Sequence, residues 1–202
     1  KKVSQTTISS DGIIRCRWCA HSDDFIHYHD NEWGMPVKDD QGLFEKLCLE
    51  SFQSGLSWRT ILAKRENFRR AFVNFDFNQV ALFNGNDINR LMSDEGIVRH
   101  RGKIEAVINN AHRAKELIAE WGALAHFFWP YEVKENTYMP QSLTTSAESV
   151  TLAKELKKRG WRFLGPTTIF AFMQATGLIN DHAEHCHSRD IVEQAKLNFI
   201  RP

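Results

Sequence analysis

The sequence predicts an all-α fold, and three observations support that class. The stretch from residue 37 to residue 129 contains no proline, and proline breaks the interior of a helix. Apolar residues in this stretch recur at helical spacing, and few segments alternate between apolar and polar residues as strands do. Hydrophobic residues make up 42% of the 202 residues, which suits one globular domain with its own core.

Several helices are expected in the first half of the chain. Residues 39–56 form the first of them, since their apolar residues repeat at i, i+3 and i+4. Shorter helices are expected over residues 57–65, 66–75, 76–83 and 85–94. Polar side chains that cap free helical N–H groups are candidates for the N-caps of the last two helices: Asp76, and Asn86 or Asp87.

The second half begins with the longest predicted helix, residues 101–121, which has one apolar face. Residues 130–147 are rich in turn-forming residues and predict a loop. A helix over residues 146–160 is expected to end at Gly160, and one over 165–177 has Pro166 at its start and Gly177 at its end. Residues 188–202 predict one more short helix.

Composition and termini bound the class of protein. The formal net charge of +1 gives no overall basic field that would by itself indicate a nucleic-acid partner. No run of eighteen apolar residues indicates a membrane span. Residues 1–12 lack the apolar core of a signal peptide and predict a disordered tail, which leaves residues 13–202 as a single domain. Four cysteines without a secretion signal indicate a cytoplasmic, reducing compartment.

Soft metal donors gather at both ends of the chain. The C-terminal stretch NDHAEHCHSRD carries His182, His185, Cys186 and His187. The N-terminal stretch CRWCAHSDDFIHYHD carries Cys16, Cys19, His21, His27 and His29. Two thiolates and two imidazoles suit zinc, so a site built from both ends would tie the termini together. Spacing leaves two ligand sets open: Cys16, Cys19, His182 and Cys186, or Cys16, His29, His182 and Cys186.

Two further groups of residues suggest nucleic-acid chemistry. In residues 94–103, two glycines bracket an apolar pair, and the tip is basic, as a phosphate-binding hairpin requires: Arg99, His100, Arg101 and Lys103. Aromatic residues are dense in the N-terminal region: Trp18, Phe25, Tyr28 and Trp33, with Trp58 farther on. Flat rings together with the carboxylate of Glu50 are the constituents of a nucleobase pocket. Taken singly, each aromatic also fits ordinary core packing.

With these residues in view, the sequence resembles the DNA-3-methyladenine glycosylase I family of bacterial alkylation-repair enzymes. The resemblance runs from about Arg15 to His187. The matching stretches are YHDNEWG (28–34), CLE (48–50), GLSW (55–58), GIVRHRGKI (96–104), LKKRG (156–160), FMQATGL (172–178) and NDH (180–182).

The resemblance implies a helix-hairpin-helix glycosylase fold of two lobes, one of them formed by both ends of the chain and joined by a structural zinc. The family's zinc pattern selects the second ligand set, Cys16, His29, His182 and Cys186. The implied base pocket holds Glu50, Tyr28 and Trp58, with Trp18 and Trp33 nearby, and Gly55 and Leu56 match the turn that enters the DNA gap. Phe25 is also expected to contact the base, and it stands where the family commonly has tyrosine.

The resemblance also implies a function. The expected reaction is the hydrolytic release of flipped-out 3-methyladenine from alkylated double-stranded DNA, which leaves an abasic site. The expected enzyme is a monomer in the bacterial cytoplasm, associated with the nucleoid and not with a membrane. Glu50 is the candidate catalytic carboxylate. Two other classes stay open: a DNA-binding module without activity, and a zinc-tied helical domain that binds protein.

Overall fold

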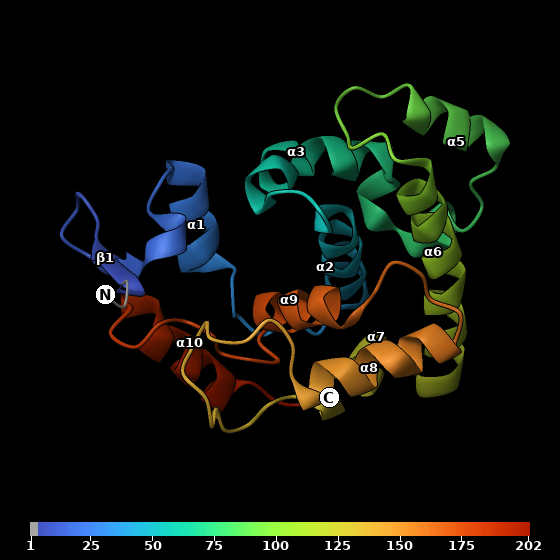
Figure 1. Ribbon diagram of the computed structural model, residues 1–202. Helices are drawn as coiled ribbons and strands as arrows, with labels where there is room; N and C mark the ends of the chain where they lie inside the picture. Colours follow the sequence, from blue (N-terminus) through green and yellow to red (C-terminus); the bar gives the residue numbers. More distant parts are fainter. Residues whose placement is uncertain (1–3) are drawn as a thin grey trace.

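The computed structural model describes residues 4–202 and confirms the all-α class (Figure 1). One part of the molecule holds most of the helices: α2 (Asp40–Gln53), α3 (Trp58–Ala71), α4 (Phe77–Val80), α5 (Gly85–Met92), α6 (Arg101–Trp121), α7 (Leu124–Phe128), α8 (Ala147–Lys158) and α9 (Pro166–Thr176). Short 3-10 turns connect some of them: η2 (Val73–Phe75) and η3 (Trp129–Tyr131).

The N-terminal segment and the segment around α10 lie together in the other part of the molecule, where blue and red ribbons meet (Figure 1). Its elements are β1 (Thr6–Ile8), β2 (Ile14–Cys16), η1 (Arg17–Cys19), α1 (Asp23–Asn31) and α10 (His187–Asn198). Helix α9 joins the two parts, because Phe172 packs in the large core whereas Ala175 packs in the small cluster formed by the chain ends.

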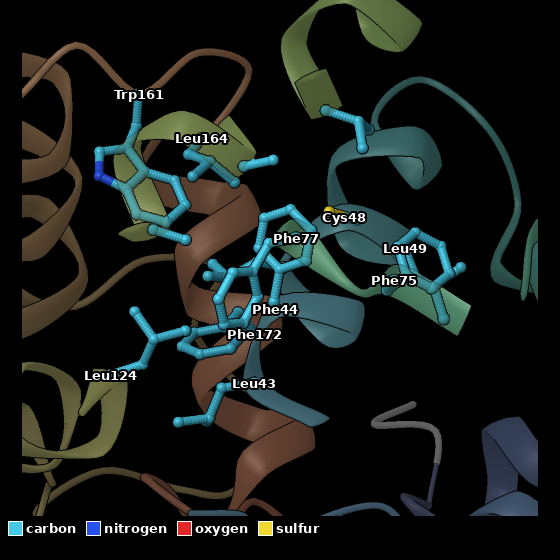
Figure 2. Close-up of a cluster of buried hydrophobic side chains, with 14 of the residues drawn as sticks. Leu43, Phe44, Cys48, Leu49, Phe75, Phe77, Leu124, Trp161, Leu164 and Phe172 are labelled. Atoms are coloured by element: carbon cyan, nitrogen blue, oxygen red, sulfur yellow. The ribbon is translucent and has the colours of Figure 1, made fainter. Parts of the chain in front are cut away.

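The core of the larger part is rich in phenylalanine. Phe44, Phe52 and Phe68 are completely buried, and burying one such ring stabilises a fold by roughly 1.5–3 kcal/mol. Figure 2 shows Phe44 of α2 facing Phe77 of α4, with the two ring centroids 5.6 Å apart and the planes nearly perpendicular. This packing anchors α2, the helix whose C-terminal turn carries Glu50.

Local signals placed most helices well, and one cap differs from the prediction. Asp76 caps α4, as expected, by accepting hydrogen bonds from the backbone N–H groups of Asn78 and Gln79. The N-cap of α5 is Asn84, whereas Asn86 or Asp87 was expected. Asp87 is instead the reciprocal partner in a capping box, since its side chain accepts from the backbone N–H of Asn84 at 2.9 Å.

The expected break between residues 65 and 66 is also wrong, because α3 runs unbroken from Trp58 to Ala71. Two tertiary contacts hold the continuous helix. Phe68 is fully buried, and Arg69 donates to both carboxylate oxygens of Glu45 on α2, at 2.8 and 2.9 Å. The chain leaves the helix only at residues 73–75, where φ is positive.

The predicted disordered tail differs from the structure in residues 6–12, while residues 1–3 of that prediction lie outside the described residues. Strands β1 and β2 pair antiparallel, with Thr7 opposite Arg15. The turn between them contains Asp11 and Gly12. Gly12 has a φ of +80°, a positive value that glycine adopts readily in hairpin turns. Arg15 is buried and binds Asp11 and Asp30, at 2.9 Å each.

The basic hairpin at residues 94–103 forms as predicted, but only part of its basic tip faces solvent. Arg99 and Arg101 are exposed. His100 caps α6 by accepting a hydrogen bond from the backbone N–H of Lys103 at 3.0 Å. Lys103 itself is buried, and its ammonium donates to the carbonyls of Phe52 and Ser54 at 2.9 and 2.6 Å. The expectation that Lys103 binds a phosphate is therefore corrected by the structure.

We expect Lys103→Met to lower the free energy of unfolding by about 2–3 kcal/mol, because hydrogen bonds from a charged donor are lost and two carbonyls lose their partner. Denaturant unfolding measures the change. Lys115→Met, at an exposed position of the same helix, is the control and should leave stability within about 0.5 kcal/mol. Equal effects of the two substitutions would contradict the structural role of Lys103.

None of the helices formed by residues 4–202 combines the length and the apolar character that crossing a membrane requires.

Candidate functional site

A group of four soft donors is buried where the two ends of the chain meet. Cys16 comes from β2, His29 from α1, His182 from the loop after α9 and Cys186 from the N-cap of α10. Their ligand atoms all lie within 4.8 Å of one another. His29 Nε2 is 3.2 Å from His182 Nδ1 and 3.4 Å from Cys186 Sγ. We call these four residues the Cys2His2 cluster.

Hydrogen bonds outside the cluster orient both imidazole rings. His29 Nδ1 lies 2.8 Å from Asp30 Oδ1, and His182 Nε2 lies 2.8 Å from the carbonyl oxygen of Trp33. Each ring is therefore free to offer its other nitrogen to an ion, which is the usual arrangement around a metal-ligating histidine. Although burial alone would raise the pKa of Asp30, hydrogen bonds from Arg15, His29 and His187 hold it at about 2.

The structure decides between the two ligand sets that spacing left open. Cys19 is not in the cluster, since its thiol donates to the carbonyl of Cys16 at 3.2 Å. His185 is exposed, and His187 contacts Asp30 at 3.1 Å from outside. Among residues 4–202, the group that can hold a metal ion through two sulfurs and two imidazole nitrogens is the one with His29.

A cavity of about 320 Å³ opens beside the cluster. Its lining combines three indole rings, one phenol, one carboxyl group and several amides: Trp18, Tyr28, Trp33, Glu50, Gln53, Trp58, Gln141, Leu143, Ala171 and Gln174. We call this cavity the aromatic pocket. Its wall comes from η1, α1 and the turn after it, α2, α3, α9 and the loop before α8, so it lies between the two parts of the molecule.

The aromatic rings form continuous walls. Tyr28 and Trp58 contact each other, with ring centroids 5.3 Å apart and planes tilted by 43°. A flat ligand held between two parallel rings needs a separation of about 7 Å, twice a van der Waals contact, so these two rings form one wall and not two facing ones. Trp18 meets Trp33 at 5.0 Å and 74°, edge to face.

Glu50 is the only carboxyl group in the lining that the described residues provide. It is 6% exposed, and none of residues 4–202 forms a hydrogen bond with its side chain. Burial raises the pKa of Glu50 to about 8, although the nearby charge of Lys46 lowers it. Burial likewise raises the pKa of Tyr28. At neutral pH the pocket lining therefore includes a protonated carboxyl group that is available to a ligand.

Phe25, which was expected to contact a base, does not line the pocket. Its ring meets that of Trp18 edge-on, at 6.1 Å between centroids, so it packs against a residue of the lining and is not itself part of the lining. Five lining residues were not predicted from the sequence: Gln53, Gln141, Leu143, Ala171 and Gln174. Of these, Gln174 lies within the FMQATGL stretch, and that stretch was the one signal that could have indicated it.

The turn between α2 and α3 presents an apolar side chain to solvent. Gly55 has a φ of +79°, and Leu56 is 40% exposed. The turn is held at both ends, because Gln53 donates to the carbonyl of Leu56 at 2.7 Å and Ser57 caps α3. The ammonium of Lys103 ties this turn to the hairpin. The exposed leucine and the exposed arginines of the hairpin thus lie on adjoining segments.

Comparisons with known proteins point to one family. The model of the methyladenine glycosylase family matches residues 18–189. The sequence is 44% identical to DNA-3-methyladenine glycosylase 1 of Escherichia coli over 177 residues, which cover 85% of this chain and 95% of that protein.

Solved structures of similar proteins superpose over most of the chain. One is 3-methyladenine DNA glycosylase I of Staphylococcus aureus, a structure that concerns the recognition of 3-methyladenine by that enzyme. It is 36% identical, with a TM-score of 0.82 over 87% of this chain and 96% of that one. Another is a tyrosine-to-phenylalanine variant of 3-methyladenine DNA glycosylase I in complex with 3-methyladenine, 37% identical, with a TM-score of 0.82 over 87% of this chain and 97% of that one.

Proposed function

The chain belongs to the methyladenine glycosylase family, and from this membership and the geometry of the aromatic pocket we propose that it removes 3-methyladenine from alkylated DNA. The N-glycosidic bond breaks, water adds to the sugar carbon, and an abasic site remains. The observation that carries the proposal is the buried, uncommitted carboxyl group of Glu50 in a pocket walled by aromatic rings.

The chemistry of the substrate suits such a pocket. Methylation at N3 places positive charge on the purine while it is attached to the sugar, so the base is already a good leaving group. The enzyme must then extrude, select and hold the base more than protonate it. Extrusion costs a few kcal/mol of unstacking, and less for a damaged base. The pocket offers ring faces for stacking and acceptor oxygens for a cation.

Glu50 changes its protonation state on binding in this proposal. Before the base binds, the pKa of about 8 keeps Glu50 neutral at pH 7. A cationic purine beside it favours the carboxylate, so binding expels a proton. The carboxylate then accepts a hydrogen bond from the exocyclic amino group of the base. Tyr28 and Trp58 supply the wall on which the base stacks, with Trp18 and Trp33 beside them.

The Cys2His2 cluster is proposed to hold zinc, which two thiolates and two imidazoles prefer. When bound, the ion would supply a structural link between the ends of the chain. Four protein ligands leave no open position for water or substrate, so the residues of this cluster take no part in the reaction.

Contacts to double-stranded DNA are proposed for the α2–α3 turn and the hairpin. Leu56 would enter the gap that the extruded nucleotide leaves, supported by the conformation of Gly55. Arg99 and Arg101, with the N-terminus of α6 capped by His100, would bind the phosphates that flank the gap. Since the substrate is chromosomal DNA, we propose that the protein acts as a monomer on the nucleoid in the bacterial cytoplasm.

Leu56→Ala is expected to lower excision from duplex DNA by about tenfold, which corresponds to a loss of about 1.4 kcal/mol from the extruded state. The affinity for free 3-methyladenine should not change, because the free base needs no extrusion. Leu82→Ala removes an even more exposed leucine, 78% accessible, and is the control. Equal losses for duplex DNA and free base would contradict the role of Leu56.

Release of 3-methyladenine from methylated duplex DNA tests the proposed function itself. The wild-type protein is expected to release the base and leave alkali-labile abasic sites at the same positions. A folded protein that binds the DNA and releases nothing would instead be a binding module. A protein that binds neither methylated DNA nor the free base would contradict the whole proposal.

A further inference from the structure

Gln141 is a pocket residue held in an unusual conformation. It lies in the loop before α8, lines the aromatic pocket and has a φ of +59°. A positive φ costs energy for any residue with a side chain, and such strain persists only where the surroundings impose it. Here Asp181 does so, because its Oδ1 accepts the backbone N–H of Gln141 at 3.0 Å.

The side-chain amide of Gln141 is also fixed. Its Nε2 donates to the backbone carbonyl of Asp181 at 3.1 Å and to the sulfur of Cys16 at 3.2 Å. A backbone carbonyl only accepts hydrogen bonds, so the nitrogen and not the oxygen of the amide must face Asp181. Both N–H groups are then used on the protein side. Among residues 4–202, Oε1 has no hydrogen-bond partner.

We infer that Oε1 of Gln141 is a second acceptor in the aromatic pocket and reads the exocyclic amino group of the base together with Glu50. This inference rests on the proposed function. An amino group carries two N–H donors, and a single carboxyl group can take one while the amide oxygen takes the other. Gln141 thereby favours bases with an exocyclic amino group over bases without one, and Cys16 and Asp181 hold it in place.

The test compares two free bases, 3-methyladenine and 3-methylpurine, which lacks the 6-amino group. Their dissociation constants are measured by calorimetry for the wild type, Gln141→Met and Gln194→Met. Methionine keeps the length of the side chain and removes the amide. Gln141→Met should reduce the preference for 3-methyladenine by about 2- to 10-fold, the range for loss of one hydrogen bond. Gln194 is exposed on α10, and its substitution should leave the preference unchanged.

The outcomes separate the possibilities. A Gln141→Met protein that weakens both bases by the same factor overturns the inference, because Gln141 would then only shape the pocket. If the wild type binds neither base, the proposed function is overturned as well. If the wild type binds 3-methyladenine and Gln141→Met has the same preference for 3-methyladenine over 3-methylpurine as the wild type, only this inference is overturned. If Gln141→Met loses its fold or its metal, a measurement on the wild-type protein replaces the comparison of variants. The Cδ resonance of Gln141, observed by ¹³C NMR, should move with 3-methyladenine and not with 3-methylpurine, and equal shifts overturn the inference.

Discussion

Glu50→Gln is expected to reduce the release of 3-methyladenine from methylated DNA by about 10²-fold or more, since general base catalysis contributes about 10²–10⁴-fold and a hydrogen bond to a charged group about 1.5–3 kcal/mol. Glutamine has the same shape but cannot become an anion beside a cationic base. The folded structure and the metal content should not change. The rate of base release from methylated DNA and the dissociation constant for free 3-methyladenine are both measured for the variant and the wild type.

The two measurements separate the roles of Glu50. A loss confined to kcat assigns a catalytic role, whereas a matching loss in affinity for the free base assigns the selection of the base. Glu95→Gln, at an exposed position, is the matched control and should retain full activity. Full activity of the Glu50 variant on methylated DNA would contradict the pocket proposed here.

The same substitution has a predicted effect on stability that depends on pH. Burial raises the pKa of Glu50 from 4.5 to about 8 in the folded protein. The folded state therefore binds more protons than the unfolded state between these values, and the stability of the wild type falls as pH rises through this range. Glutamine does not titrate. Between pH 5 and pH 9 the free energy of unfolding of the variant should therefore rise relative to that of the wild type by up to a few kcal/mol, at about 1.4 kcal/mol per pKa unit.

Unfolding in urea at a series of pH values measures this difference. Near pH 4, where Glu50 is protonated in both states, wild type and variant should unfold alike. Above pH 8 the variant should be the more stable of the two. A difference that stays constant across the range would mean that Glu50 ionises normally and is not enclosed as the structure describes.

The second large effect is expected at the Cys2His2 cluster. Cys186→Ser should abolish stoichiometric metal binding and lower the free energy of unfolding by several kcal/mol, because structural zinc contributes about 10–16 kcal/mol of apparent binding energy in small zinc domains. A loss of about 4 kcal/mol corresponds to a decrease in Tm on the order of 10 °C for a chain of this size. Metal analysis and calorimetry measure both quantities, and removal of the metal by a chelator should reproduce them.

Binding of 3-methyladenine should fall together with the metal. His29 and Tyr28 are neighbours on α1, and Trp33 accepts a hydrogen bond from His182 through its carbonyl, so loosening the cluster displaces two walls of the aromatic pocket. Cys19→Ser is the matched control, since this buried thiol lies beside the cluster and donates to Cys16 without joining it. Metal loss in Cys19→Ser as well as in Cys186→Ser would assign the ligands to the other set, which also contains Cys186, and metal retention in Cys186→Ser would contradict both sets.

Much of the fold was predictable because helices are local structures. Proline-free stretches, apolar periodicity and caps such as Asp76 depend on residues a few positions apart, and those predictions are confirmed. The errors have different causes. The continuity of α3 depends on Glu45 of another helix, and the cap of α5 depends on which of several neighbouring polar residues the chain turn selects. The Asp-Gly turn of the N-terminal hairpin was a local signal that the prediction overlooked.

By itself, the sequence determined the helical class, the soft donors at both ends and, through long matching stretches, the family. Spacing left two ligand sets open and the resemblance favoured the one with His29, but only the tertiary structure shows that these donors meet, because residues more than 150 positions apart are brought to within 4 Å in the cluster. It also turned Lys103 inward and placed Gln141 in the pocket wall. These choices depend on burial and on long-range hydrogen bonds, which no spacing along the chain encodes, whereas helices and caps depend on neighbours that the sequence displays directly.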